Sequence, residues 1–228
     1  APFLSFYGTL TSACLLTVSS SPMHLCFFED AQVPGLRPLV ESRAAYALRL
    51  GGRTLFETAT DAFVPIGVAL HARPLVADVT RRRYPAASVN ALPDGADVLF
   101  LNGRYVAASG AAQQRLAAAP DRDEARAFVQ GETLVAAWVP NAATTLPDDV
   151  LARPALTAEA FGDLPVSELA DATLVRRPWD LLTTLRPALA RDVDFRFGAS
   201  VSVPLADRPH ASVQGGVTGG QPERIHFG

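Results

Sequence analysis

The sequence contains no lysine, so all 20 of its basic residues are arginine. This absence excludes Schiff-base chemistry and the lysine of a P-loop phosphate site. Anion recognition must therefore rely on arginine guanidinium groups, backbone N–H groups or a helix N-terminus. GC-rich coding produces the same bias, so the composition limits the mechanism without indicating a function.

Cysteine is scarce as well. Cys14 and Cys26 are too few for a disulfide framework, which favours a cytoplasmic location. The net charge of −3 gives no general attraction to nucleic acid or to an anionic membrane. No apolar run approaches the length of a membrane span. We therefore expect small-molecule ligands rather than a nucleic acid or a membrane.

The 228 residues suffice for one large α/β domain, or for a domain with an appendage. Residues 1–22 include an apolar stretch, but no basic residue precedes it, and the only methionine is Met23. We expect an upstream extension at 1–22, with a secretory signal as the alternative. The folded domain is expected at 23–203, and a Gly/Pro-rich linker at 204–228.

Short apolar runs alternate with helically spaced segments along the chain. Strands are predicted at residues 24–28, 66–70, 97–101 and 132–139, and helices at 53–63, from 73 onward, at 109–119 and at 179–189 with an interruption near Pro187. This alternation predicts a layered α/β domain with a mostly parallel, Rossmann-like central sheet.

Ligands of such sheets bind at the carboxyl ends of the strands. The residues at those positions are Glu29, Asp30, His71, Arg73, Asn102 and Arg104. Close to the first strand, four arginines fall between Arg37 and Arg53, where they could bind phosphate. The alternative is a solvated loop whose arginines pair with Glu41 and Glu57.

Three patches carry a family resemblance. The first patch runs from Phe28-Glu29-Asp30 through Leu36-Arg37-Pro38-Leu39, Ser42-Arg43 and Leu48-Arg49-Leu50-Gly51 to Thr54-Leu55-Phe56-Glu57. The second patch is Asn102-Gly103-Arg104. The third patch is Arg177-Pro178-Trp179-Asp180, followed by Asp194-Phe195. Together they resemble sugar nucleotidyltransferases, including the N-terminal uridylyltransferase half of bifunctional N-acetylglucosamine-1-phosphate uridylyltransferase/acetyltransferases. The resemblance implies a nucleotide-diphospho-sugar transferase fold. It also implies a reaction that joins a nucleoside triphosphate to a sugar 1-phosphate and releases pyrophosphate.

The same resemblance suggests a role for each candidate site residue. Arg37 and Arg43 are expected to be catalytic, acting on phosphates. Substrate-binding roles are expected for Arg53, Asn102 and Arg104, and Mg²⁺ would be held by Glu29, Asp30 and Asp180. Structural alternatives stay open, because a strand-terminal acidic pair also suits a solvated turn, and Asp180 also suits a helix cap.

The sequence also departs from the family pattern. The loop at 30–36 contains one glycine where these enzymes have a glycine-rich loop, Asn102 stands where they carry a metal-binding aspartate, and their lysine is absent. A catalytically degenerate sugar-nucleotide-binding or scaffold domain is therefore the alternative hypothesis. It would be attached to a C-terminal hexapeptide-repeat β-helix acyltransferase, through which it would form a homo-oligomer.

Overall fold

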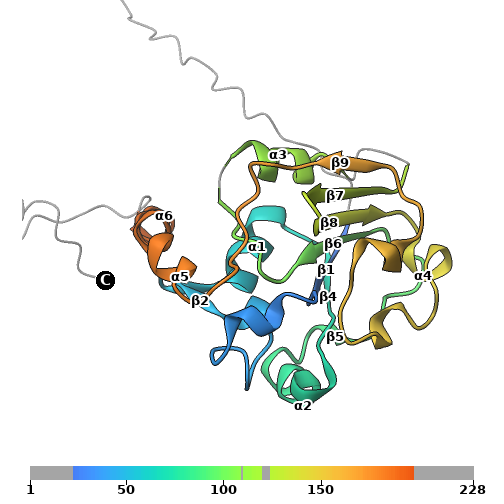
Figure 1. The fold of residues 1–228 in the computed structure, drawn as a ribbon, viewed down its shortest axis with the longest axis horizontal. Helices are drawn as coiled ribbons and strands as arrows, with labels where there is room; N and C mark the ends of the chain where they lie inside the picture. Colours follow the sequence, from blue (N-terminus) through green and yellow to red (C-terminus); the bar gives the residue numbers. More distant parts are fainter. Residues whose placement is uncertain (1–22, 109, 120–123, 198–228) are drawn as a thin grey trace, which may run out of the picture.

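The computed structural model describes residues 23–108, 110–119 and 124–197 of the chain (Figure 1). The predicted extension at 1–22 and the predicted linker at 204–228 lie outside these residues. Asp194 and Phe195 belong to a described helix, but their side chains are not described.

A seven-stranded sheet forms the centre of the fold, in the order β5-β4-β1-β6-β8-β7-β9. The strands are β1 (His24–Phe28), β4 (Gly67–Leu70), β5 (Ser88–Val89), β6 (Val98–Asn102), β7 (Arg126–Gln130), β8 (Thr133–Val139) and β9 (Val166–Glu168). β1 pairs in parallel with β4 and β6, and β8 is antiparallel to β6 and β7. The predicted layered α/β fold with a mostly parallel sheet is confirmed.

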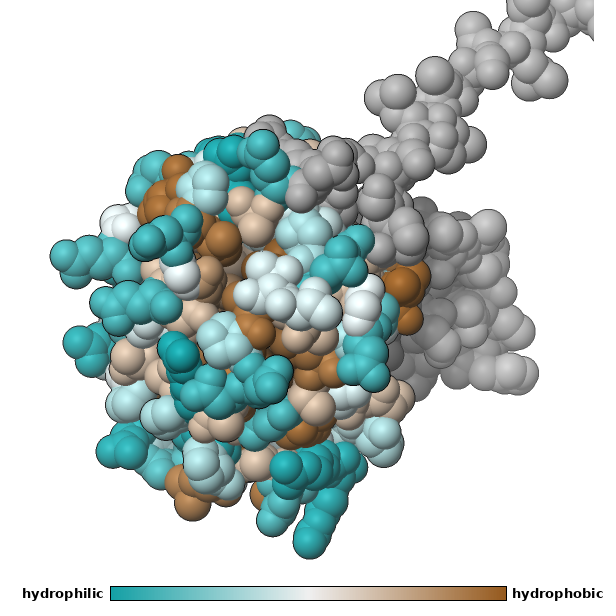
Figure 2. Space-filling view, turned by 90° about the vertical axis from the view of Figure 1, so that its right-hand side faces the viewer, coloured by the Kyte–Doolittle hydropathy of each residue, from teal (hydrophilic) through white to brown (hydrophobic). Residues whose placement is uncertain are grey.

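Side chains alternate between the two faces of the sheet, because successive residues of a strand point in opposite directions. Leu25 and Phe27 pack in a core with α1 (Leu55–Phe63), α2 (Pro74–Arg83) and α3 (Ala111–Ala117). On the other face, Cys26 and Phe28 pack in a core with α4 (Ala142–Thr145) and the 3-10 helices η4 (Val150–Ala152) and η5 (Ala158–Phe161). Figure 2 views the side that carries α4, where hydrophilic and hydrophobic residues are mixed.

A third core lies beyond the carboxyl ends of β1 and β6. It joins the 3-10 helix η1 (Val33–Leu36), the hairpin of β2 (Arg49–Leu50) and β3 (Arg53–Thr54), and the C-terminal helices α5 (Asp180–Thr183) and α6 (Leu185–Phe197). The backbone N–H of Gly52 donates to Asp192 of α6 over 2.8 Å. This contact fixes α6 beside the hairpin, although about 140 residues separate the two in sequence (Figure 1).

None of the helices in the described part of the chain is long and apolar enough to cross a membrane.

Candidate active site

A cavity of about 140 Å³ opens at the carboxyl ends of β1 and β4, where the sheet topology predicts a ligand site. Its walls are the end of β1, residues 31–41, the start of α2, and Pro154 with Ala155. Pockets for small molecules usually measure roughly 300–1,000 Å³. The cavity, which we call the cleft, therefore encloses a group the size of a phosphate or a sugar ring, and a larger ligand would extend out of it.

Glu29 lies on the floor of the cleft with only 1% of its surface exposed. Its Oε1 accepts hydrogen bonds from Ala45 N–H at 2.9 Å and from Arg73 Nη1 at 2.5 Å, and its Oε2 accepts from Arg73 N–H at 3.2 Å. The backbone of Glu29 donates to His71 Nδ1 and accepts from Leu156 N–H. Glu29 thus connects the end of β1 to Ala45, to the start of α2 and to the segment at Leu156.

Asp30 forms a buried, bidentate ion pair with Arg104. Nε and Nη2 of Arg104 donate to the two carboxylate oxygens at 2.9 and 2.5 Å. Asp30 also accepts from Asn102 Nδ2 at 2.9 Å and from Gln32 N–H at 3.2 Å. Arg104 Nη1 donates to the carbonyl of Val175 at 3.0 Å. A buried pair is stable only when its remaining hydrogen-bonding groups are satisfied, and these contacts meet that condition.

Asn102 and Arg104, both predicted to bind substrate, are directed into this network. Arg104 is completely buried and Asn102 is 1% exposed. Asn102 Nδ2 also donates to the carbonyl of Leu134 at 2.8 Å, and its Oδ1 accepts from Arg104 N–H at 3.0 Å. Neither side chain can contact a ligand without breaking these bonds. Their observed role is to join the ends of β1, β6 and β8.

The predicted phosphate-binding arginines do not all lie together. Arg37 is on the cleft wall, where it pairs with Glu41 at 3.0 Å through side chains that are 67% and 51% exposed. Such exposed pairs are weak, so an anion in the cleft can replace Glu41. Arg43 is exposed on the same loop, outside the cleft lining. Arg53 pairs with Asp61 and lines a separate depression on the side of α1.

Arg73 also lines the cleft, although none of the three sequence patches includes it. Besides binding Glu29, its Nη2 donates to the backbone carbonyls of Val40 and of Arg43, the latter at 3.2 Å. Its position just after the strand predicted at 66–70 is the sequence signal that indicates it. Its contacts could not be predicted, because no sequence pattern indicates where the loop that contains Val40 and Arg43 lies.

His71, at the end of β4, is completely buried beneath the cleft. Its Nδ1 accepts the N–H of Glu29 at 3.1 Å, so the ring proton belongs on Nε2, which lies 2.7 Å from the carbonyl of Arg153. Burial lowers the pKa of His71, chiefly through desolvation of the imidazolium form. His71 is therefore a neutral structural link between β1, β4 and the segment that carries Pro154.

Each of the three carboxylates predicted to hold Mg²⁺ is hydrogen-bonded within the protein. Glu29 and Asp30 are each bound to a guanidinium group. Asp180, the first residue of α5, accepts the N–H groups of Arg176 and Arg177, in the segment before the helix, at 2.7 and 2.8 Å. The described residues contain no group of three His, Cys, Asp or Glu side chains able to hold a metal ion. The Mg²⁺ site stays a prediction, with Glu29 and Asp30 occupied by arginine in this structure.

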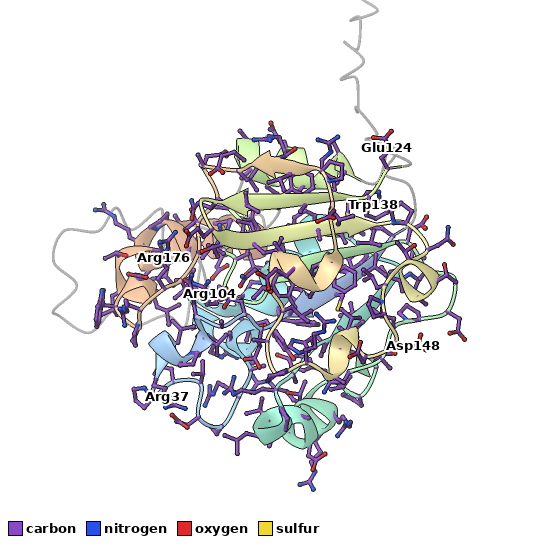
Figure 3. All side chains as sticks on the ribbon, turned by 45° about the vertical axis from the view of Figure 1, so that its right-hand side comes forward. Arg37, Arg104, Glu124, Trp138, Asp148 and Arg176 are labelled. Atoms are coloured by element: carbon purple, nitrogen blue, oxygen red, sulfur yellow. The ribbon has the colours of Figure 1, made fainter. Side chains whose placement is uncertain are left out.

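The loop at 30–36, which stands where the family has a glycine-rich loop, contains one glycine, Gly35, at a position of close packing. A Cβ atom at Gly35 would lie 3.0 Å from the carbonyl oxygen of Arg176 and 3.7 Å from Nη1 of Arg177. Gly35 thus permits the segment before α5 to cross closely over the loop after β1. Figure 3 shows Arg37, Arg104 and Arg176 on the same side of the molecule.

Two comparisons with known proteins find similarities to this chain, and one finds none. A search of solved structures finds a protein assigned as a glucose-1-phosphate thymidylyltransferase from Bacillus anthracis, in complex with a sucrose. It shares 9% sequence identity and a TM-score of 0.49, over 75% of this chain and 96% of that chain. No curated protein matches the sequence. A family model described as sugar nucleotidyl transferase matches residues 25–198, a range that includes every wall of the cleft. The chain therefore belongs to the sugar nucleotidyl transferase family.

Proposed function

We propose that this protein joins a nucleoside triphosphate to a sugar 1-phosphate at the cleft, releasing pyrophosphate. Family membership supports nucleotidyl transfer. The observation that carries the assignment to this cleft is Arg37. It is a weakly paired arginine on the wall of a cavity at the carboxyl end of the central strand.

In this reaction a phosphate oxygen of the sugar 1-phosphate attacks the α-phosphorus of the triphosphate. The bond between the α-phosphorus and the bridging oxygen breaks, and pyrophosphate leaves with the bonding electrons. Such transfers depend on positioning and on stabilising negative charge. Because the chain has no lysine, we assign to Arg37 the stabilisation of phosphate charge in the cleft. Arg43 lies on the same loop and is exposed to solvent.

Mg²⁺ is the cofactor that the family resemblance implies, and it would help to neutralise the phosphates. Because Glu29 and Asp30 are paired with arginine, the protein's own charge stabilisation in the cleft is assigned to arginine. A requirement for Mg²⁺ in turnover would indicate that the ion arrives with the triphosphate.

The test is a pyrophosphate-release assay over a panel of nucleoside triphosphates and sugar 1-phosphates, with and without Mg²⁺. We expect saturable release with one pair of substrates. Arg37→Gln should reduce kcat/KM at least about tenfold, the usual scale for losing a charge-assisted contact. Arg81→Gln removes an exposed arginine of α2 that pairs with Asp78 and does not line the cleft, and it should leave the rate unchanged. Inactivity over the whole panel would exclude the enzymatic proposal.

Binding of a nucleotide sugar without turnover is the second candidate function, as in a degenerate or scaffold domain. The observation that favours it is the pairing of Glu29 and Asp30 with arginine, which keeps these two carboxylates from binding a metal ion. Here nucleotide sugars should raise the melting temperature by mass action, without pyrophosphate release from any substrate pair. The two assays together separate the candidates.

A further inference from the structure

We propose that Glu29 and Arg73 form a positioning pair that holds residues 37–45, the loop bearing Arg37 and Arg43, in place beside the cleft. The pair acts through the backbone of the loop. The inference rests on the proposed function in one respect, namely that this loop contacts the phosphates of the substrate.

The Arg73 guanidinium group makes three contacts that connect the floor of the cleft to the loop. Its Nη1 is 2.5 Å from Glu29 Oε1. Its Nη2 donates to the carbonyl of Val40 and, at 3.2 Å, to the carbonyl of Arg43. Two of the three acceptors are therefore backbone atoms of the loop. A planar guanidinium presents its donors in a rigid fork that reaches separated acceptors, whereas a lysine ammonium is a compact point charge.

Glu29 holds the end of the same loop directly. Its Oε1 accepts the N–H of Ala45 at 2.9 Å, two residues after the carbonyl of Arg43 that Arg73 binds. Glu29 is buried, and hydrogen bonds that involve a charged group are strongest where water is excluded. The loop is thus held at three backbone positions by one ion pair whose carboxylate is buried, while the Arg37 and Arg43 side chains remain exposed.

This arrangement bears on substrate binding through conformational entropy. A loop that is not held must lose its freedom each time a ligand binds, and that loss reduces affinity. A loop fixed in advance avoids it. Substitutions in the pair should therefore weaken phosphate binding even though Arg37 and Arg43 remain in the sequence.

The experiment compares wild type with Arg73→Gln, Arg73→Lys and Glu29→Gln, and with the double variant that combines Glu29→Gln and Arg73→Gln. Arg81→Gln is the matched control, because it removes an arginine from the same helix outside the cleft. Backbone amide exchange of residues 40–45 is measured without ligand. Nucleoside triphosphate affinity is measured by calorimetry.

We expect Arg73→Gln to accelerate exchange in the loop and to weaken triphosphate binding about tenfold, the scale of one charged hydrogen bond. Arg73→Lys should fall between Arg73→Gln and wild type. The double variant should bind no more weakly than either single variant, because partners in one pair are not additive. The control should match wild type in both measurements.

Unchanged exchange of residues 40–45 in Arg73→Gln would show that the pair does not hold the loop. If Arg73→Gln exchanges faster but binds triphosphate as tightly as wild type, while Arg37→Gln binds weakly, the position of the loop does not matter for binding. Either result overturns the proposal. If wild type binds no triphosphate or nucleotide sugar, the proposed function fails, and amide exchange alone still decides whether the pair holds the loop. Should Glu29→Gln not fold, Arg73 carries the test, since its side chain is 20% exposed.

Discussion

Arg104 donates two hydrogen bonds to Asp30 from a position with no solvent exposure, joining the carboxyl end of β1 to the turn after β6. This buried pair lies next to the cleft. Both carboxylate oxygens of Asp30, which the family resemblance suggests as a metal ligand, therefore accept hydrogen bonds from Arg104. The guanidinium group already supplies the positive charge that a cation bound to Asp30 would supply.

We predict that Arg104→Met destabilises the protein by about 3–5 kcal/mol, because Asp30 would be left buried without its partner. Replacing both residues, as in Asp30→Leu with Arg104→Met, should cost less than Arg104→Met alone, since no uncompensated charge remains. Urea unfolding of the two variants measures the difference. A double variant that loses the sum of two single-variant effects would contradict this account of the pair.

The stability of the fold should fall in mild acid because of His71. Its pKa is lowered in the folded state by burial, while the unfolded chain titrates near the ordinary value of 6.5. The unfolded state therefore takes up the proton first as the pH decreases. The stability associated with neutral His71 is fully present above about pH 6.5 and is lost progressively below it, toward the folded pKa.

The measurement is the free energy of unfolding between pH 8 and pH 5, for wild type and for His71→Gln. Wild type should exceed the variant at pH 8, and the gap should narrow as the pH falls. A gap that is constant with pH would show that His71 protonation is not coupled to unfolding.

Much of the fold could be predicted because its central strands are continuous apolar runs bounded by polar residues. β1 occupies the residues predicted, and β4 and β6 deviate by one residue. The edge strand β9, only three residues long with Val166 61% exposed, carries no such signal and was not predicted. The helix break falls at Thr184 rather than near Pro187, because proline is tolerated in the first turn of α6.

The candidate site could be predicted only in outline. Topology indicates Glu29 and Asp30, since strand ends meet at one edge of a parallel sheet. Their partners could not be identified, because Arg73 lies 44 residues beyond Glu29 and Arg104 lies 74 residues beyond Asp30. Nothing in the local sequence distinguishes an arginine that neutralises a buried carboxylate from one that binds phosphate. Arg53 illustrates this, because its motif suggests the substrate site and the fold places it elsewhere.

Gly51→Ala should destabilise the attachment of α6 to the hairpin. Gly51 has φ of +77°, which strains any residue with a Cβ atom, and that Cβ would overlap the carboxylate of Asp192. We expect a loss of about 2–3 kcal/mol from the two effects together. Gly131→Ala is the matched control, since φ is +58° there and a Cβ would meet open space. Thermal unfolding of both variants isolates the Asp192 contact, and equal losses would show that it contributes nothing.

Mg²⁺ alone should not stabilise the protein, because the carboxylates that would bind it are already neutralised. The hydrogen bonds to Glu29 and Asp30 would have to be broken before an ion could enter, and desolvated arginine would then be left unpaired beside a second cation. We therefore expect an unchanged melting temperature in millimolar Mg²⁺, and a shift only when a nucleoside triphosphate is also present. Arg104→Met provides the complementary measurement, because it leaves Asp30 without its counter-ion and should make stability sensitive to divalent cations. A clear shift of wild type with Mg²⁺ alone would mean that the described residues provide a metal site after all, and that the arginine pairs rearrange to form it.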